Sequence, residues 1–276
     1  SHVRQVPAPD SYRPLGGEGG MAHAHAFAAK VQAAIDDLNA SGAGFSAVIF
    51  CPAFLNEGFP MLEPGWLAPT LEVVRKAGGL FVADEVQPGF ARNGERFWGH
   101  QRIGLQPDIV TMGKPMGNGH PVAGVVTTPD IMAAFRKSFR YFNTFGGNPV
   151  SCAAAMAVLD VIRDEGLQEN ARVVGAYARD GLAKLAAKYD WIGDVRGYGL
   201  FFGAEIVTDR QAKTPAPAYT TRVAKEMRRP GVPTNKPGIH HNPPKTRPPM
   251  PFSTENADLM LETLDGVLAD LGPAQD

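Results

Sequence analysis

The chain has little of several features that mark particular classes of protein. It has 2 cysteines among its 276 residues, Cys51 and Cys152, which lie far apart and outside any CxxC spacing. Neither a disulfide framework nor a thiol redox motif is therefore expected. No apolar run reaches the length of about 20 residues that spans a bilayer. Lys and Arg (27) nearly balance Asp and Glu (28), so no electrostatic feature favours nucleic acid or a membrane as the partner.

Metal ligands and targeting signals are also sparse. The chain has 7 histidines, but the pairs His23/His25 and His240/His241 lack a further ligand at helical spacing. We therefore expect no metal site. No basic-then-apolar leader follows Ser1, and we expect a cytoplasmic protein.

Short apolar runs alternate with segments of helical periodicity through the first half of the chain. The runs typical of strands cover residues 45–50, 80–84, 109–112 and 122–127, and the helical segments cover 22–38, 67–76 and 148–162. This alternation predicts an α/β fold whose mostly parallel sheet is covered by helices on both faces. We place a domain boundary near residue 160, so that residues 1–160 form part of a large domain and residues 161–276 a smaller α+β domain.

The second half predicts a helix over residues 171–188 and two glycine-joined strands within residues 192–207. The buried side of that helix should carry Val173, Val174, Tyr177, Leu182 and Leu185. A final helix should begin at a cap at Ser253 or Thr254. We expect the alanine-rich helix at 148–162 to be buried.

Two residues at the ends of predicted strands carry groups that suit catalysis. Lys114 follows the run IVTM and lies among glycines, which let the backbone approach a ligand closely. A desolvated lysine there is a usable nucleophile, although a solvated loop lysine fits the local pattern equally well. Asp84 ends the run LFVAD, where a carboxylate needs a partner such as a protonated pyridine nitrogen, a capped helix or a salt bridge.

Three segments around these residues resemble class III aminotransferases, which are pyridoxal-phosphate enzymes of fold type I. The segments are DEVQPGFARNGERFWGHQ, PDIVTMGKPMGNGHPVAGVV and YFNTFGGNPVSCAAAMAVLDVI. They occur in the family's order, with 30 residues from Asp84 to Lys114 and another 30 to Thr144. The similarity is nearest to the subgroup that contains alanine–glyoxylate aminotransferase 2 and the related phospho-lyases.

The resemblance implies a role for five residues around the cofactor, pyridoxal 5′-phosphate. Lys114 matches the lysine that carries the cofactor as a Schiff base and moves the proton, and Asp84 matches the partner of the pyridine nitrogen. Val86 matches the side chain packed on one face of the ring, and Gln87 the residue that binds its phenolic oxygen. Thr144 matches a threonine that reaches the phosphate of a neighbouring subunit, which implies a homodimer with its active site at the interface.

The resemblance also implies the reaction. Arg247 matches the arginine that clamps the substrate carboxylate, a role that suits a planar guanidinium; alternatively it is a surface arginine beside two prolines. The expected activity is transfer of an amino group from an amine or amino acid to a 2-oxo acid. A phospho-lyase that acts on an amino-alcohol phosphate is the alternative within the family. A truncated, non-catalytic dimerising remnant is a third hypothesis.

Three departures from the family pattern bear on these hypotheses. The family's Gly-Ser phosphate cup and ring-stacking aromatic residue have no counterpart here, so we expect the chain to start partway through the large domain. Cys51 stands where a glutamate usually ends the preceding strand. Residues 229–249 contain seven prolines, so we expect this segment to be irregular in place of a central strand.

Overall fold

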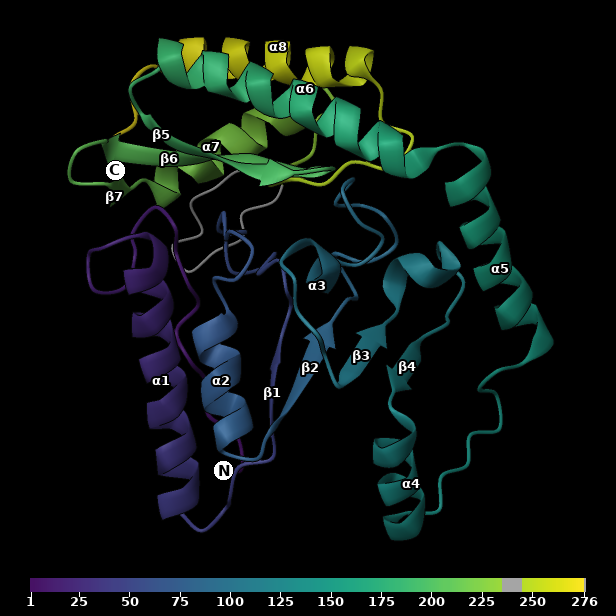
Figure 1. Ribbon diagram of the computed structural model, residues 1–276. Coiled ribbons are helices and arrows are strands. Elements are labelled where there is room, and N and C mark those ends of the chain that lie inside the picture. Colours follow the sequence, from purple (N-terminus) through teal and green to yellow (C-terminus); the bar gives the residue numbers. More distant parts are fainter. Residues whose placement is uncertain (235–244, 276) are drawn as a thin grey trace.

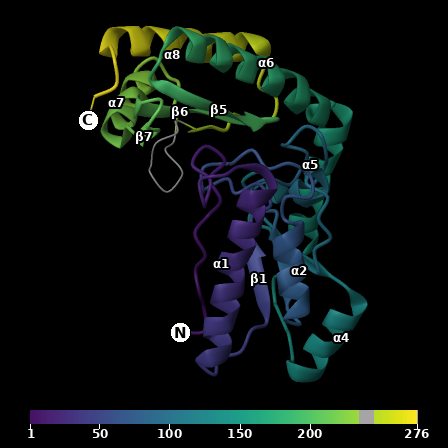
Figure 2. The same cartoon turned by 60° about the vertical axis from the view of Figure 1, so that its left-hand side comes forward.

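The computed structural model describes residues 1–234 and 245–275 of the chain. These residues form two blocks, each built around its own sheet (Figure 1). One block holds the sheet β1–β4 with α1 and α2 beside it, and in the other α6 and α8 run side by side over the second sheet (Figure 2). None of the helices within the described residues is long and apolar enough to cross a membrane. The predicted domain division near residue 160 stays a prediction.

The elements follow the predicted alternation closely. Those of the first block are α1 (Gly20–Ala40), β1 (Ala47–Phe50), α2 (Ala68–Lys76), β2 (Leu80–Asp84), α3 (Gly99–Arg102), β3 (Ile109–Met112), the 3-10 turn η1 (Lys114–Gly117), β4 (Gly124–Thr127) and α4 (Pro129–Ser138). The rest are α5 (Pro149–Asp164), α6 (Leu167–Lys188), β5 (Ile192–Tyr198), β6 (Phe201–Asp209), β7 (Thr214–Pro215), α7 (Pro217–Arg228), β8 (Lys245–Thr246) and α8 (Thr254–Leu271). Ser253 caps α8 by accepting a hydrogen bond from the backbone N–H of Asn256, as predicted.

The first sheet has the order β1-β2-β3-β4. β1, β2 and β3 are parallel, with Phe50 beside Ala83 and Asp84 beside Thr111. β4 is antiparallel to β3, because only the segment 113–123 connects the two and no crossover helix intervenes. The predicted mostly parallel sheet is therefore confirmed, with an antiparallel edge strand.

Only one face of this sheet is covered by the described residues. Phe27, Val31 and Ile35 of α1 pack with Val74 of α2 against Phe81 of β2. On the other side, Ile49 and Val125 are each 63% exposed. The expectation of cover on both faces is wrong for this part of the chain, because apolar strand residues indicate a need for cover and do not say which polypeptide provides it.

The second sheet is antiparallel and has the order β5-β6-β7, with β8 also paired to β6. Its core includes Val174, Leu182 and Leu185 of α6, as predicted. Val173 and Tyr177 were expected on the same side, but they are 46% and 43% exposed. That part of the prediction is wrong because two adjacent valines cannot both face one core on a helix, and the Tyr177 hydroxyl instead donates to Asp258 at 2.6 Å.

Two further expectations differ from the structure. α5 was expected to be buried, but only Ser151 and Ile162 of this helix are buried. Its alanine-rich composition permits close packing without ensuring that a partner is present. In the proline-rich segment, residues 235–244 lie outside the described residues, while Lys245 and Thr246 form β8 beside Gly203 and Phe202. These two residues keep their backbone N–H groups between pairs of prolines, so a short pairing survives there.

A buried group of charges joins the N-terminal segment to the second block. Arg196 on β5 donates to the buried Glu205 on β6, and Arg13 binds the other oxygen of Glu205 at 2.7 Å. The Arg196 guanidinium also donates to the carbonyl of Gly58 at 3.1 Å, in the loop that follows β1. Because partly paired buried charges are costly, this network fixes how that loop sits against the second block.

Candidate active site

Three adjacent parallel strands end at the same edge of the first sheet, and a chemically useful residue follows each end. Cys51 follows β1, Asp84 ends β2, and Lys114 lies two residues beyond the last residue of β3. The carboxyl ends of parallel strands are the usual place for ligand-binding groups in such sheets. The structure therefore brings Asp84 and Lys114, predicted separately from the sequence, to one edge.

Asp84 faces a cavity of about 250 Å³ whose wall also includes Cys51, Glu57 and Gln87. One oxygen, Oδ1, accepts a hydrogen bond from the backbone N–H of Val86 at 3.0 Å. Within the described residues, the other oxygen has no hydrogen-bond partner. A half-buried carboxylate with one oxygen held and the other unpaired is placed to bind a cationic group in the cavity.

Lys114 begins η1 with an unusual backbone conformation. Its φ of +32° lies in the left-handed region that non-glycine residues rarely adopt, and such strain is concentrated at functional sites. Its side chain is exposed and makes no hydrogen bond or ion pair to another described residue. Val86 lies close by, since a Cβ built on Gly113 would be 3.9 Å from the Val86 Cγ2. The structure thus places Val86 beside the backbone that carries Lys114.

Gln87 and Arg247, which were predicted from sequence segments far apart in the chain, are in direct contact. Arg247 donates from Nη1 to the Gln87 side-chain oxygen at 2.7 Å. The amide nitrogen of Gln87 is left as a donor toward the cavity that it lines. Arg247 is exposed, so its guanidinium retains donors for a ligand at the mouth of the site.

Lys245 is a residue of this region that the sequence analysis missed. It is 6% exposed, and its amine donates to the carbonyl of Leu55 at 2.7 Å, in the loop that forms the cavity wall. Burial lowers the pKa of Lys245 to about 8, and the nearby charges of Arg247 and Lys114 add to this effect. The sequence offered one signal for Lys245: it lies two residues before Arg247, and residues at that spacing share one side of an extended chain.

The cavity wall also contains a thiol and a second carboxylate. Burial raises the pKa of Cys51 to about 12, so this thiol stays protonated and is not a nucleophile at neutral pH. Glu57 lies on the same wall, and its buried Oε2 has no hydrogen-bond partner within the described residues. The wall therefore has an acid although Cys51 replaces the glutamate expected at the strand end.

Thr144 lies apart from these residues. It is exposed, in the segment between α4 and α5. There the side chain of Asn143 holds a turn by accepting hydrogen bonds from the backbone N–H groups of Phe145 and Gly146. No contact within the described part of the chain joins Thr144 to Asp84 or Lys114, so the predicted role of Thr144 across an interface stays a prediction.

Comparison with known proteins supports one family for the whole chain. The profile of the aminotransferase class-III family matches residues 2–268. Alanine–glyoxylate aminotransferase 2 homolog 2, mitochondrial, of Arabidopsis thaliana is 44% identical over 95% of this chain and 54% of its own length. Ethanolamine-phosphate phospho-lyase homolog 1 of Caenorhabditis elegans is 39% identical over 86% of this chain and 52% of its own length.

A solved structure shows the same backbone. A phospholyase from Arthrobacter in complex with phosphoethanolamine superposes with a TM-score of 0.91 at 42% identity, over 99% of this chain and 64% of that one. The chain spans about half the length of the curated relatives it matches. Because one of these relatives is named as mitochondrial, the cytoplasmic location stays a prediction. The matched family consists of pyridoxal-phosphate-dependent enzymes, and its fold is the predicted fold type I. On this family match and this degree of identity, the chain belongs to the class-III aminotransferases.

Proposed function

We propose that this protein is a pyridoxal-phosphate-dependent aminotransferase that moves an amino group from an amine or amino acid to a 2-oxo acid. The observation that carries the proposal is the position of Asp84 and Lys114 at the ends of neighbouring strands, with the free oxygen of Asp84 on a cavity. A carboxylate and an amine at one sheet edge are the two groups that this chemistry requires.

The residues present fit the ring end of the cofactor. Asp84 supplies an unpaired carboxylate oxygen for the pyridine nitrogen, Gln87 an amide N–H for the phenolic oxygen, and Val86 an apolar surface for one ring face. None of the described residues on this cavity belongs to a helix N-terminus, the usual cradle for a phosphate. When bound, the cofactor supplies an aldehyde that takes up an amine and a ring that withdraws electrons from the substrate Cα.

The chain's own groups then have distinct tasks. Lys114 would hold the cofactor through Nζ, and its amine would take the proton from the substrate Cα and return it. Asp84 keeps the pyridine nitrogen protonated, because a nearby carboxylate favours the charged form of that group. Arg247 binds the substrate carboxylate and, through Gln87, is held in place relative to the cofactor's phenolic side.

Replacement of Lys114 by alanine should abolish turnover and the visible absorbance of the cofactor-loaded protein, because no other described amine follows a strand end at this edge. Absorbance spectra and single-turnover assays with an amino donor measure both effects. The matched control is Lys184→Ala on the exposed side of α6, which should behave as the wild type. Wild-type turnover in Lys114→Ala contradicts the proposal, and a wild type with no lysine-dependent absorbance favours the non-catalytic remnant.

A phospho-lyase activity is the second candidate, and two observations favour it. The solved structure that superposes at a TM-score of 0.91 is that of a phospholyase with phosphoethanolamine. In addition, Lys245 and Arg247 are close enough for their charges to interact, and two cations suit a dianionic phosphate better than a single carboxylate.

The two activities give different products from the same protein. With phosphoethanolamine and no 2-oxo acid, a phospho-lyase releases inorganic phosphate and ammonia, whereas an aminotransferase releases neither in catalytic amounts. With alanine and a 2-oxo acid, only the aminotransferase forms pyruvate steadily. We expect pyruvate formation and no phosphate release. Phosphate release without pyruvate formation would establish the second candidate.

The lowered pKa of Lys245 predicts a pH dependence for anionic substrates. Below about pH 8 the amine is charged and adds to the attraction of Arg247, and above that pH the charge is lost. We expect kcat/KM to fall by about fivefold to tenfold between pH 7 and pH 9.5, where one decade corresponds to ~1.4 kcal/mol. In Lys245→Met the value at pH 7 should already be low and this fall should be absent. An unchanged pH profile in Lys245→Met would exclude the role.

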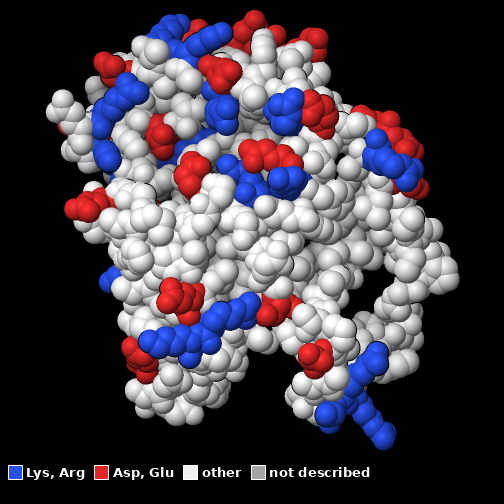
Figure 3. Space-filling model, viewed as in Figure 1, with Lys and Arg blue, Asp and Glu red and all other residues white. Residues whose placement is uncertain are grey.

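We also propose that the protein forms a homodimer through the segment between α4 and α5. Tyr141, Phe142 and Phe145 are 72%, 85% and 80% exposed. They flank Thr144, and beside them Val125, Phe135 and Tyr141 line a cavity of about 720 Å³ on the uncovered face of the sheet. Figure 3 shows an opening beside α4 that is bordered mainly by uncharged atoms, whereas α4 itself carries several charged side chains. Exposed apolar surface of this extent is typical of an interface.

Phe142→Glu should shift the protein toward the monomer, because burying a carboxylate in an apolar interface is costly. Light scattering coupled to size-exclusion chromatography measures the mass. Lys137→Glu at the exposed end of α4 introduces the same carboxylate outside the aromatic patch and should leave the dimer intact. A monomeric wild type would refute the proposed interface.

A further inference from the structure

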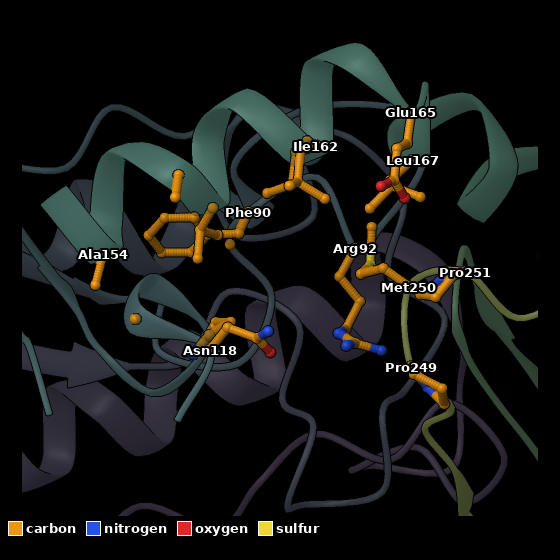
Figure 4. A pocket seen from close by; sticks show the side chains of 16 residues that line it. Phe90, Arg92, Asn118, Ala154, Ile162, Glu165, Leu167, Pro249, Met250 and Pro251 are labelled. Atoms are coloured by element: carbon orange, nitrogen blue, oxygen red, sulfur yellow. The ribbon is translucent and has the colours of Figure 1, made fainter. Parts of the chain in front are cut away.

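A further cavity lies beside the candidate catalytic site. It has a volume of about 520 Å³ and is enclosed by the end of η1, the helix α5 and the segment 249–251 (Figure 4). Several lining residues lie one to three positions after those of the candidate site: Gly89 and Phe90 after Gln87, Pro115 after Lys114, and Pro249 after Arg247. None of Asp84, Gln87 and Lys114 lines it. The volume lies within the range of about 300–1,000 Å³ that is usual for small-molecule sites.

Arg92 is the cation of this cavity, and no ion-pair partner for it lies in the described part of the chain. Its Nη1 donates to the carbonyl of Pro248 at 2.5 Å, and its guanidinium lies 5.6 Å from the centre of the Phe201 ring. No carboxylate of the described residues lies within ion-pair distance of Arg92. Burial, together with the nearby charge of Arg247, lowers the pKa of Arg92 to about 10, which reflects the cost of an uncompensated charge.

The rest of the lining is mostly apolar, with Asn118 and Glu165 as its other polar side chains, and it indicates what kind of molecule fits. Phe90, Ala154 and Ile162 form one part of the wall. Figure 4 shows the Arg92 side chain between Asn118 and Met250. An apolar wall with one guanidinium suits a molecule with an apolar body and one anionic group.

Glu165 restricts the charge that a ligand of this cavity can carry. It lines the same cavity at the end of α5, and it is exposed, so it stands at the rim. A carboxylate there repels a second negative charge on any molecule that has already placed an anion on Arg92. The combination favours a monoanion over a dicarboxylate or a phosphate monoester.

We propose that this cavity is a binding site, separate from the catalytic one, for a small organic monocarboxylate whose carboxylate binds Arg92 and whose apolar body lies against α5. The bound carboxylate accepts hydrogen bonds from the guanidinium donors that Pro248 leaves free. The apolar body covers Phe90 and Ile162, which lie at the cavity surface. The site is independent of the proposed aminotransferase activity, because none of the residues assigned to that reaction lines this cavity.

Calorimetric titration of the full chain with 4-methylpentanoate tests the proposal, because this molecule carries one carboxylate on an apolar body. Arg247 also suits a carboxylate, so the variants of Arg92 and Arg247 are compared. Saturable binding is expected for the carboxylate and not for 4-methylpentan-1-ol, which has the same body without the charge. Arg92→Met should weaken binding by about tenfold to a hundredfold, the range for a hydrogen bond to a charged group. Ala154→Phe, which fills the cavity and keeps Arg92, should block binding as well.

The matched control for the charge is Arg247→Met, which removes the neighbouring guanidinium from the candidate catalytic site and should leave binding within about twofold. Glu165→Gln should narrow the preference for 4-methylpentanoate over adipate. Thermal unfolding of each variant shows whether it is folded. The proposal is overturned if the wild type gives no saturable heat, if the alcohol binds as tightly as the acid, or if Arg247→Met loses binding while Arg92→Met and Ala154→Phe keep it.

Discussion

The parallel register of β1, β2 and β3 is the constraint on which the rest of the site depends. Parallel strands end at the same edge, so Cys51, Asp84 and Lys114 come together although 63 residues separate the first from the last. A shift of one residue between β2 and β3 would turn Asp84 to the opposite face of the sheet. The register is maintained by burial of Phe81 and Ala83 against the helices on one face, which leaves the alternate residues for the other.

Positive charge is the second organising feature. Lys114, Lys245, Arg247 and Arg92 lie within one region, and the pKa values of Lys245 and Arg92 are lowered by burial and by these like charges. Packing cations together costs stability, and folded proteins keep such arrangements chiefly where a ligand supplies the opposite charge. The proposed substrate clamp at Arg247 and the proposed binding site at Arg92 both draw on this cluster of cations.

Local structure was largely predictable, and its tertiary context was not. The strands at 80–84 and 109–112 were predicted to the residue, since continuous apolar runs bounded by glycine or acids leave few alternatives. Burial of α5 was predicted wrongly, because the sequence of an alanine-rich helix does not indicate whether another segment covers it. Lys245 was missed because only the fold reveals that its amine reaches the carbonyl of Leu55, 190 residues earlier in the chain.

By itself, the sequence determined the fold class and the order of the elements, and its resemblance to class III aminotransferases predicted the amine, carboxylate and amide of the candidate site. These follow from local patterns and from motifs that lie within contiguous segments of the sequence. The tertiary structure decided which cations lie close together and that Gln87 contacts Arg247. It also decided, for the residues described, that Arg92 has no anionic partner and which face of the sheet is exposed. Such facts depend on contacts between residues far apart along the chain, and free energies of burial and of charge interaction are set by those contacts and not by composition.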